Sequence, residues 1–117
     1  MCGRFALIIT PAELEKIFGL RLDEEFNPRY NIAPSQTVPV ITYLEKDNKK
    51  KLSSMKWGLV PSWAKDPSIG DRMINARSET IQEKPSFRNA FQRRRALIPA
   101  SGFFEWKREG TTKNPYF

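Results

Sequence analysis

Val38-Pro39-Val40-Ile41-Thr42-Tyr43-Leu44 is a stretch rich in β-branched residues. Such side chains pack well on a pleated, half-buried surface, so the stretch is predicted to be a strand. Residues 52–60 are extended and partly alternating, and the charged residues between the two stretches predict a hairpin. We expect residues 49–51, three consecutive lysines, at its polar tip. Pro39 indicates an edge strand or a bulge, because proline has no N–H to donate.

Two short helices are predicted on either side of this hairpin. Thr10 and Glu13 have the spacing of a capping box, Pro11 occupies the first helical position, and Gly19 supplies a stop. The first helix is therefore about eight residues long. A second short helix is predicted over residues 85–94, where a proline and a serine begin the segment.

The remaining segments predict loops and further strands. Residues 61–72 carry prolines, a glycine and scattered charges and are expected to form a long surface loop. Strands are predicted at 96–99 and 103–107, and residues 114–117 resemble a turn that enters an apolar strand. Periodicity alone therefore predicts a strand-rich α+β fold.

Composition narrows the classes of function. A chain of 117 residues can form one small domain, its single Cys excludes an intrachain disulfide, and it contains no His. We therefore expect no metal ion and no cofactor. No apolar run approaches the roughly 20 residues of a membrane span, so no membrane partner is expected. The net charge of +7 indicates a polyanionic partner, although basic runs are often only solvated surface.

The only cysteine is the second residue. If Met1 is removed, Cys2 carries both an α-amine and a thiol, and this 1,2-aminothiol can close onto an aldehyde as a thiazolidine ring. Near neutral pH, a useful fraction of each free group is in its nucleophilic form. A retained Met1 would leave only a thiol and a reversible hemithioacetal. The alternative is that Cys2 is a small residue at a frayed terminus.

Five sequence blocks follow one another along the chain: Cys2-Gly3-Arg4-Phe5, Tyr30-Asn31-Ile32-Ala33-Pro34, Trp57-Gly58-Leu59-Val60-Pro61-Ser62-Trp63, Ile74-Asn75-Ala76-Arg77-Ser78-Glu79 and Gly102-Phe103-Phe104-Glu105-Trp106-Lys107. Together they resemble the SOS response-associated peptidase family of abasic-site processing proteins. The resemblance implies mainly antiparallel strands around a partial β-barrel, with short peripheral helices. It also implies an enzyme of the DNA damage response that binds single-stranded DNA at an abasic site.

The resemblance further implies roles for three residues in catalysis. Cys2 would attack the open-chain deoxyribose aldehyde and form a stable thiazolidine cross-link. Asn75 would donate hydrogen bonds around the sugar, and Glu105 would move protons during ring opening and imine formation. From strand alternation alone, Glu105 is equally well an outward-facing residue paired with Lys107 or Arg108.

Four further residues match positions that contact DNA in the family. Arg4 and Arg77 would contact phosphates that flank the lesion, since a guanidinium presents a fork that matches phosphate oxygens. Pro34 and Trp63 would contact bases and shape a kinked strand. In an extended segment, Asn75 and Arg77 project from the same face, although a turn Asn and a surface Arg are the simpler interpretation.

The three tryptophans are interpreted differently. Trp57 and Trp106 lie in apolar stretches and are predicted to be core residues. Trp63 lies on the predicted loop, where an aromatic face can stack on a base for roughly 1–3 kcal/mol.

The main departure of this chain from the family concerns a histidine; the second is the Met1 that precedes Cys2. Members carry a His in the C-terminal half of the domain, in a stretch like His-Asp-Arg-Met-Pro, whereas this chain has none. We therefore expect residues 1–117 to be the N-terminal half of the domain, truncated at its C-terminus, with full activity in doubt.

Two other functions remain open at this stage. One is a Cys-dependent peptidase with Cys2 as nucleophile and Glu105 as base, weakened because no His can activate the thiol. The other is a non-catalytic module that binds single-stranded DNA. We expect a cytoplasmic protein, associated with the nucleoid if it is bacterial; the sequence leaves its oligomeric state open.

Overall fold

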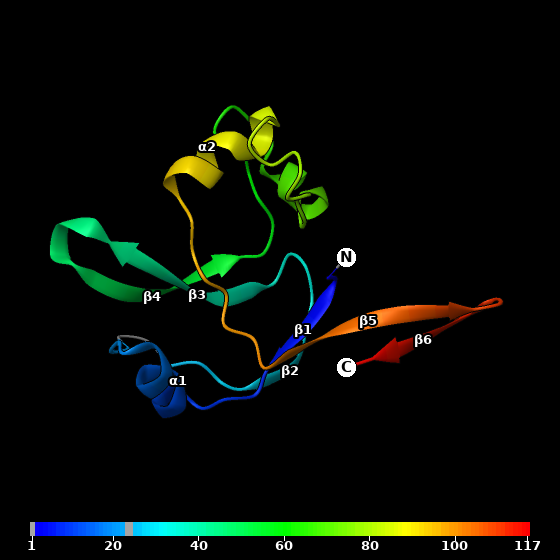
Figure 1. Cartoon of the computed structure of the whole chain (residues 1–117), viewed down its shortest axis with the longest axis horizontal. Coiled ribbons are helices and arrows are strands. Elements are labelled where there is room, and N and C mark those ends of the chain that lie inside the picture. The colour runs from blue at the N-terminus through cyan, green and yellow to red at the C-terminus, as the bar shows by residue number, and fades with distance from the viewer. Residues whose placement is uncertain (1, 23–24) are drawn as a thin grey trace.

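The computed structural model describes residues 2–22 and 25–117, so the removal of Met1 concerns a residue outside the described part. Antiparallel strands form a four-stranded sheet in the order β2-β1-β5-β6 and a separate hairpin, β3-β4 (Figure 1). The strands are β1 (Arg4–Leu7), β2 (Arg29–Ile32), β3 (Thr37–Leu44), β4 (Lys49–Lys56), β5 (Gly102–Glu109) and β6 (Thr112–Tyr116). The helices are α1 (Pro11–Phe18), α2 (Pro85–Arg93) and the 3-10 helices η1 (Glu45–Asp47) and η2 (Pro67–Arg72).

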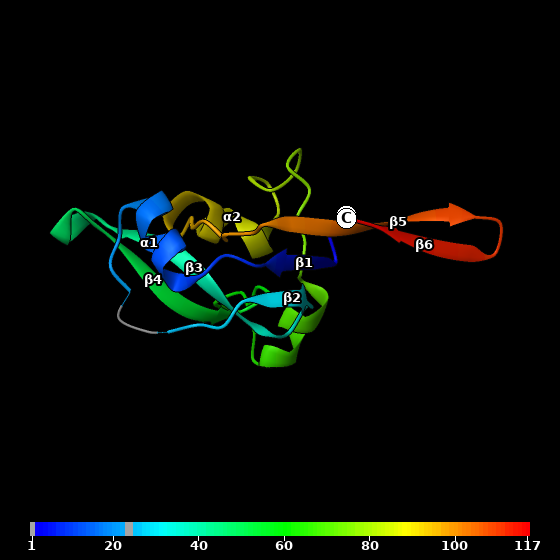
Figure 2. The same cartoon turned by 90° about the horizontal axis from the view of Figure 1, so that it is seen from below.

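The fold is α+β, with curled antiparallel strands that form a half-barrel and short helices outside it, as expected. The β5–β6 hairpin projects away from the rest of the molecule in both views (Figure 2). The expectation that residues 1–117 are half of a longer domain stays a prediction. Within the residues that the structure describes, we find no helix with the length and apolarity needed to cross a membrane.

Strand β1 lies in the middle of the larger sheet. Phe5 is opposite Ile32 of β2 on one side and opposite Phe103 of β5 on the other. All of β1 except its first residue is buried. The residues just before β1 are therefore held at the edge of the core rather than left to fray.

The predicted hairpin is confirmed, but its details differ. The strands pair without interruption from Thr37 opposite Lys56 to Leu44 opposite Lys49. The tip is η1 followed by Asn48 at φ 50°, so the three lysines lie within β4 and not at the tip. Because β4 ends at Lys56, the predicted strand over 52–60 extended too far. Pro39 lies on an edge strand, as expected.

Both predicted helices are present. In α1, the Thr10 hydroxyl accepts a hydrogen bond from the Glu13 N–H, and the Glu13 carboxylate accepts one from the Thr10 N–H at 2.7 Å. The backbone and side-chain hydrogen bonds from Thr10 lower the pKa of Glu13. Gly19 ends α1 at φ 60°. Pro85 begins α2, and its N-cap, Lys84, makes no side-chain capping bond.

Two groups of buried side chains form the core of the described residues. The larger group is shared between the four-stranded sheet and β3: Phe5, Leu7, Ile32, Val38 and Val40. The smaller group joins α1 to β3 and consists of Leu14, Leu20 and Ile41. All the buried residues of these two clusters therefore lie between Phe5 and Ile41, and the later segments pack around them.

Three other predictions need correction. Residues 96–99 form no strand and contribute only one bridge, between Leu97 and Ile41. Half of the predicted loop at 61–72 is the helix η2. Strands β1 and β2 were not predicted, because four-residue segments carry little alternation and are defined by their pairing partners. The predicted strands at 103–107 and 114–117 correspond to β5 and β6.

Gly58 is expected to be intolerant of a side chain. Its φ is 140°, and an added Cβ would lie 2.3 Å from the carbonyl oxygen of Gly70, a buried residue of η2. We predict that Gly58→Ala lowers the free energy of unfolding by about 2 kcal/mol or more, measured by chemical denaturation.

Gly3→Ala is the matched control, because nothing lies within 4 Å of the Cβ it would add. It should change the free energy of unfolding by less than about 0.5 kcal/mol. Equal stability of the two variants would show that the contact between Gly58 and η2 is not as tight as described.

Candidate active site

Cys2 lies at the edge of the core, immediately before β1. Its side chain is half-buried and packs against the cluster that contains Phe5, and its thiol donates a hydrogen bond to the Arg4 carbonyl at 3.6 Å. Trp57 packs against the same cluster, with its ring centroid 5.4 Å from that of Phe5. Cys2 is therefore held by its neighbours while part of it remains open to a reactant.

Asn75 is brought to Cys2 from 73 positions away. Its side-chain amide donates a hydrogen bond to the Cys2 carbonyl at 2.8 Å. The segment before Asn75 is fixed by two bonds: the Trp57 indole N–H donates to the Ile74 carbonyl at 3.0 Å, and the Leu59 N–H donates to Met73 at 3.0 Å. The tryptophan that packs on Phe5 thus also positions the residue that contacts Cys2.

Glu105 lies on β5, beside the start of β1. The register pairs Arg4 with Phe104 and Phe5 with Phe103, and continuing it by one residue places Gly3 opposite Glu105. Strand alternation puts Glu105 on the same face of the sheet as Phe103 and its partner Phe5. Glu105 is half-buried there. Glu105 therefore shares a sheet face with Phe5, a member of the cluster against which Cys2 packs.

Arg4 and the turn after β2 form a second part of the site. Arg4 Nη1 donates a hydrogen bond to Asn31 Oδ1 at 2.9 Å, so β2 orients this guanidinium. Pro34 is half-buried in the turn between β2 and β3, followed by Ser35 at φ 68°. The Ser35 N–H donates to the Trp57 carbonyl at 3.0 Å, which ties the turn to the same tryptophan.

An ion pair supports this turn from η2. Asp71 accepts a hydrogen bond from the Ser35 hydroxyl at 2.8 Å and pairs with Lys56 at 2.7 Å. The bonds from Lys56 and then from Ser35 lower the pKa of Asp71. The carboxylate therefore remains ionised at neutral pH, and this contribution to stability is lost only as the pH falls into the acid range.

Arg77 and Trp63 lie on exposed loops. Arg77 begins a turn in which its carbonyl accepts the Thr80 N–H at 3.2 Å. Trp63 is 59% exposed and follows the buried Pro61, as the loop prediction required. The common orientation of Asn75 and Arg77 stays a prediction, because residues 75–77 lie in no strand.

A hollow of about 460 Å³ opens beside Asn75. One wall comes from the loop segments near Trp57 and Ile74, and the opposite wall comes from α2 and includes Phe87 and Phe91. Arg94 and Arg95 lie at the end of that wall. The hollow therefore combines an apolar surface with cations and includes Asn75, the residue that contacts Cys2.

Sequence reasoning found part of this site. Trp57 is half-buried against the core, as predicted, but Trp106 is 42% exposed on β5 and is not a core residue. Asn31 and Asp71 were not assigned roles, and only their contacts in the fold indicate that they position Arg4 and Ser35. Residues 2–22 and 25–117 contain no cluster of three His, Cys, Asp or Glu side chains that could hold a metal ion.

The sequence matches one family model over its whole length: SOS response associated peptidase, residues 1–117. The abasic site processing protein YoqW of Bacillus subtilis (strain 168) is 44% identical over 119 residues, covering 98% of this chain and 52% of the relative. The abasic site processing protein YedK of Escherichia coli (strain K12) is 36% identical over 125 residues, covering 100% of this chain and 53% of the relative.

The fold agrees with these matches. A crystal structure of a protein from Bacteroides thetaiotaomicron superposes with a TM-score of 0.83 and 26% sequence identity, covering 97% of this chain and 52% of that one. The chain thus spans about half the length of the curated relatives it matches. With the family model and the five blocks in agreement, this chain belongs to the SOS response associated peptidase family.

Proposed function

We propose that this chain processes abasic sites by forming a covalent thiazolidine cross-link between Cys2 and the open-chain deoxyribose aldehyde. The observation that carries the proposal is the contact between Asn75 and the Cys2 carbonyl, which joins two of the family's sequence blocks around the chain's only thiol. The names of the relatives YoqW and YedK, which match nearly the whole chain, support abasic-site processing.

The chemistry requires that Met1 is removed. The α-amine of Cys2 then adds to the aldehyde carbon, and loss of one water gives an imine. The thiolate next adds to the imine carbon, and the proton from the thiol ends on the ring nitrogen. One water leaves overall, and no oxidant or metal is needed. Because amine and thiol belong to one residue, the second step is intramolecular and strongly favoured.

Asn75 and Glu105 have supporting roles. The Asn75 amide fixes the Cys2 backbone and so the direction from which the amine meets the sugar. Glu105 accepts and returns the protons that move when the closed sugar opens and the carbinolamine loses water. Its place on the face of Phe5 is consistent with this role.

The proposed partner is single-stranded DNA that contains an abasic site. Arg4 and Arg77 bind phosphates on either side of the lesion, while Pro34 and the exposed Trp63 contact neighbouring bases. The net charge of +7 favours binding to the phosphates of such a strand. With this partner, the proposed location is the cytoplasm, in association with the nucleoid if the cell is bacterial.

We predict that the chain, with Met1 removed, forms a stable adduct with an oligonucleotide carrying one abasic site. The adduct should survive boiling on a denaturing gel without reductant. Cys2→Ser should abolish it, because an amine and a hydroxyl give only an imine or an oxazolidine, both of which hydrolyse readily. Intact mass should show addition of the strand with loss of one water.

The same assay separates the alternative functions. Binding without a boil-stable adduct would contradict the cross-link and favour a non-catalytic module. Cys2-dependent cleavage of a peptide without any adduct would favour a peptidase. A chain that retains Met1 is a further control and should form no boil-stable adduct.

Asn75→Ala should slow cross-link formation about fivefold, because one hydrogen bond typically contributes about 1 kcal/mol. The rate at saturating DNA is the measurement. Asn114→Ala is the matched control: Asn114 also donates from its amide, to Glu109 at 3.2 Å, but on the projecting β5–β6 hairpin. Equal rates for the two variants would exclude a positioning role for Asn75.

Arg77→Gln should lower the slope of log Kobs against log salt by about 0.7 for a single strand, the loss of one phosphate contact. The slope is measured by fluorescence anisotropy on a lesion-free strand. Arg108→Gln removes one exposed charge from the β5–β6 hairpin and should leave the slope unchanged. The same slope change in both variants would mean that Arg77 acts only through net charge.

A further inference from the structure

The hollow beside Asn75 adjoins a second one. The first hollow includes Arg94, Arg95 and Ala96 in its lining. The second, of about 560 Å³, is lined by Arg93, by the same Arg95 and Ala96, and by Tyr43 at the edge of β3. The two hollows share Arg95 and Ala96 and therefore adjoin along this segment, with Asn75 lining the first and β3 residues lining the second. Together they are called the depression.

The arginine segment is fixed in place along this depression. The Leu97 N–H donates to the Ile41 carbonyl at 2.9 Å, and the Ile41 N–H donates to the Leu97 carbonyl at 2.8 Å. These two bonds hold the chain after α2 against the free edge of β3. The Arg95 guanidinium also lies over the Phe91 ring at 5.8 Å. The three arginines therefore follow a defined course and are not on a free loop.

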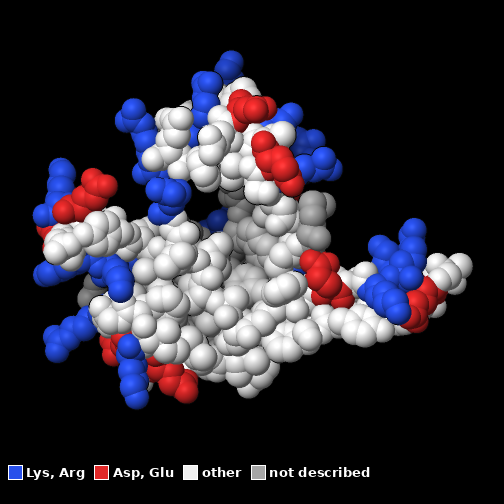
Figure 3. Space-filling model, in the orientation of Figure 1, with Lys and Arg blue, Asp and Glu red and all other residues white. Residues whose placement is uncertain are grey.

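The depression is electropositive. Arg93, Arg94 and Arg95 are all exposed, and Glu45 is the acidic residue in the lining of the second hollow. Figure 3 shows both basic and acidic side chains on the helical part of the molecule, with basic side chains beside the hollowed region below it. Tyr43, which is 55% exposed, adds an aromatic surface in the second hollow.

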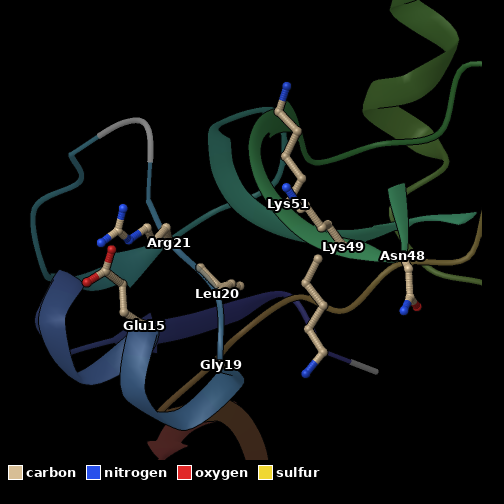
Figure 4. Close-up of a pocket in the computed structure, with 8 residues that line it drawn as sticks. Glu15, Gly19, Leu20, Arg21, Asn48, Lys49 and Lys51 are labelled. Carbon is tan, nitrogen blue, oxygen red and sulfur yellow. The ribbon is translucent and has the colours of Figure 1, made fainter. Parts of the chain in front are cut away.

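A third hollow, near the hairpin tip, is excluded from this surface. It shares Lys50 with the second, but the Lys50 ammonium already donates to the Phe18 carbonyl at the end of α1, at 2.7 Å. Figure 4 shows Arg21 and Glu15 pointing toward one another across its rim and Lys51 pointing away from α1. The Lys50 ammonium therefore binds within the fold, and the Lys51 side chain faces away from α1.

We infer that the single-stranded DNA flanking the lesion leaves the Cys2–Asn75 site through this depression and is bound there by Arg93, Arg94 and Arg95. Each guanidinium offers a fork for phosphate oxygens, and Tyr43 offers a face on which a base stacks. The inference rests on the proposed function for the identity of the partner. It adds a second contact region, formed by the segment that follows α2.

The test uses a lesion-free oligothymidine of about 20 nucleotides, so that it does not depend on cross-linking. Arg93→Gln/Arg95→Gln removes two of the three charges and leaves the Leu97 bridge intact. The slope of log Kobs against log salt should fall by about 1.4, twice the value of about 0.7 expected for one single-strand phosphate contact. Circular dichroism confirms that α2 is retained.

Arg108→Gln/Lys113→Gln is the matched control. It removes the same charge from a cross-strand pair on the β5–β6 hairpin, outside the depression. Its slope should equal that of the unmodified chain. Equal slopes for the two double variants would overturn the inference, because binding would then follow net charge alone.

Two further measurements test whether the depression continues the lesion site. One strand should bind per protein, and adding Arg77→Gln should lower the slope by about 0.7 more. Two strands per protein would overturn the inference, since the arginines would then form a separate site. If the slopes behave as expected but no abasic adduct forms, the DNA path stands and the cross-linking chemistry fails.

Discussion

The pairing of β1 between β2 and β5 is the constraint on which the rest of this structure depends. Phe5 lies between Ile32 of β2 and Phe103 of β5, and it is buried because the core cluster and Trp57 pack over it. A chain terminus usually frays, because few contacts offset the entropy of ordering it. Here β1 lies between two other strands of the sheet, so Cys2, which precedes it, is held in a defined position. A reactive group at a chain end becomes part of a site only through this placement.

Trp57 connects that strand to the loops that complete the site. Its ring contacts Phe5, its indole N–H holds Ile74, and its backbone holds the turn at Ser35. The turn after β2 and the segment before Asn75 are thereby both held by one residue, through its backbone and its side chain. Loops that lie on a surface are usually mobile, and such shared anchors define their geometry. The close approach of Gly58 to Gly70 belongs to the same arrangement, since any side chain at Gly58 would push η2 away.

The basic residues fall into two groups: those that already contact a partner within the fold and those that lie beside the candidate site. Lys56 pairs with Asp71, and Lys50 caps the carbonyl end of α1, so these lysines stabilise the fold. Arg93, Arg94 and Arg95 instead lie along a depression beside Asn75. The net charge of +7 is thus a poor guide to binding by itself. The proposed DNA surface follows from the cations that remain available next to the candidate site.

The sequence by itself determined the local elements. The capping box of α1, the proline at the start of α2 and the β-branched stretch of β3 specify their structures through neighbours a few positions away. It also determined the family, through five ordered blocks, and the candidate residues those blocks contain. Tertiary structure alone decided that β1 and β2 are strands, that Trp106 is exposed and that residues 96–99 make a single bridge. It alone brought Asn75 to Cys2, because a contact across 73 positions depends on how separate elements pack and leaves no pattern in either segment.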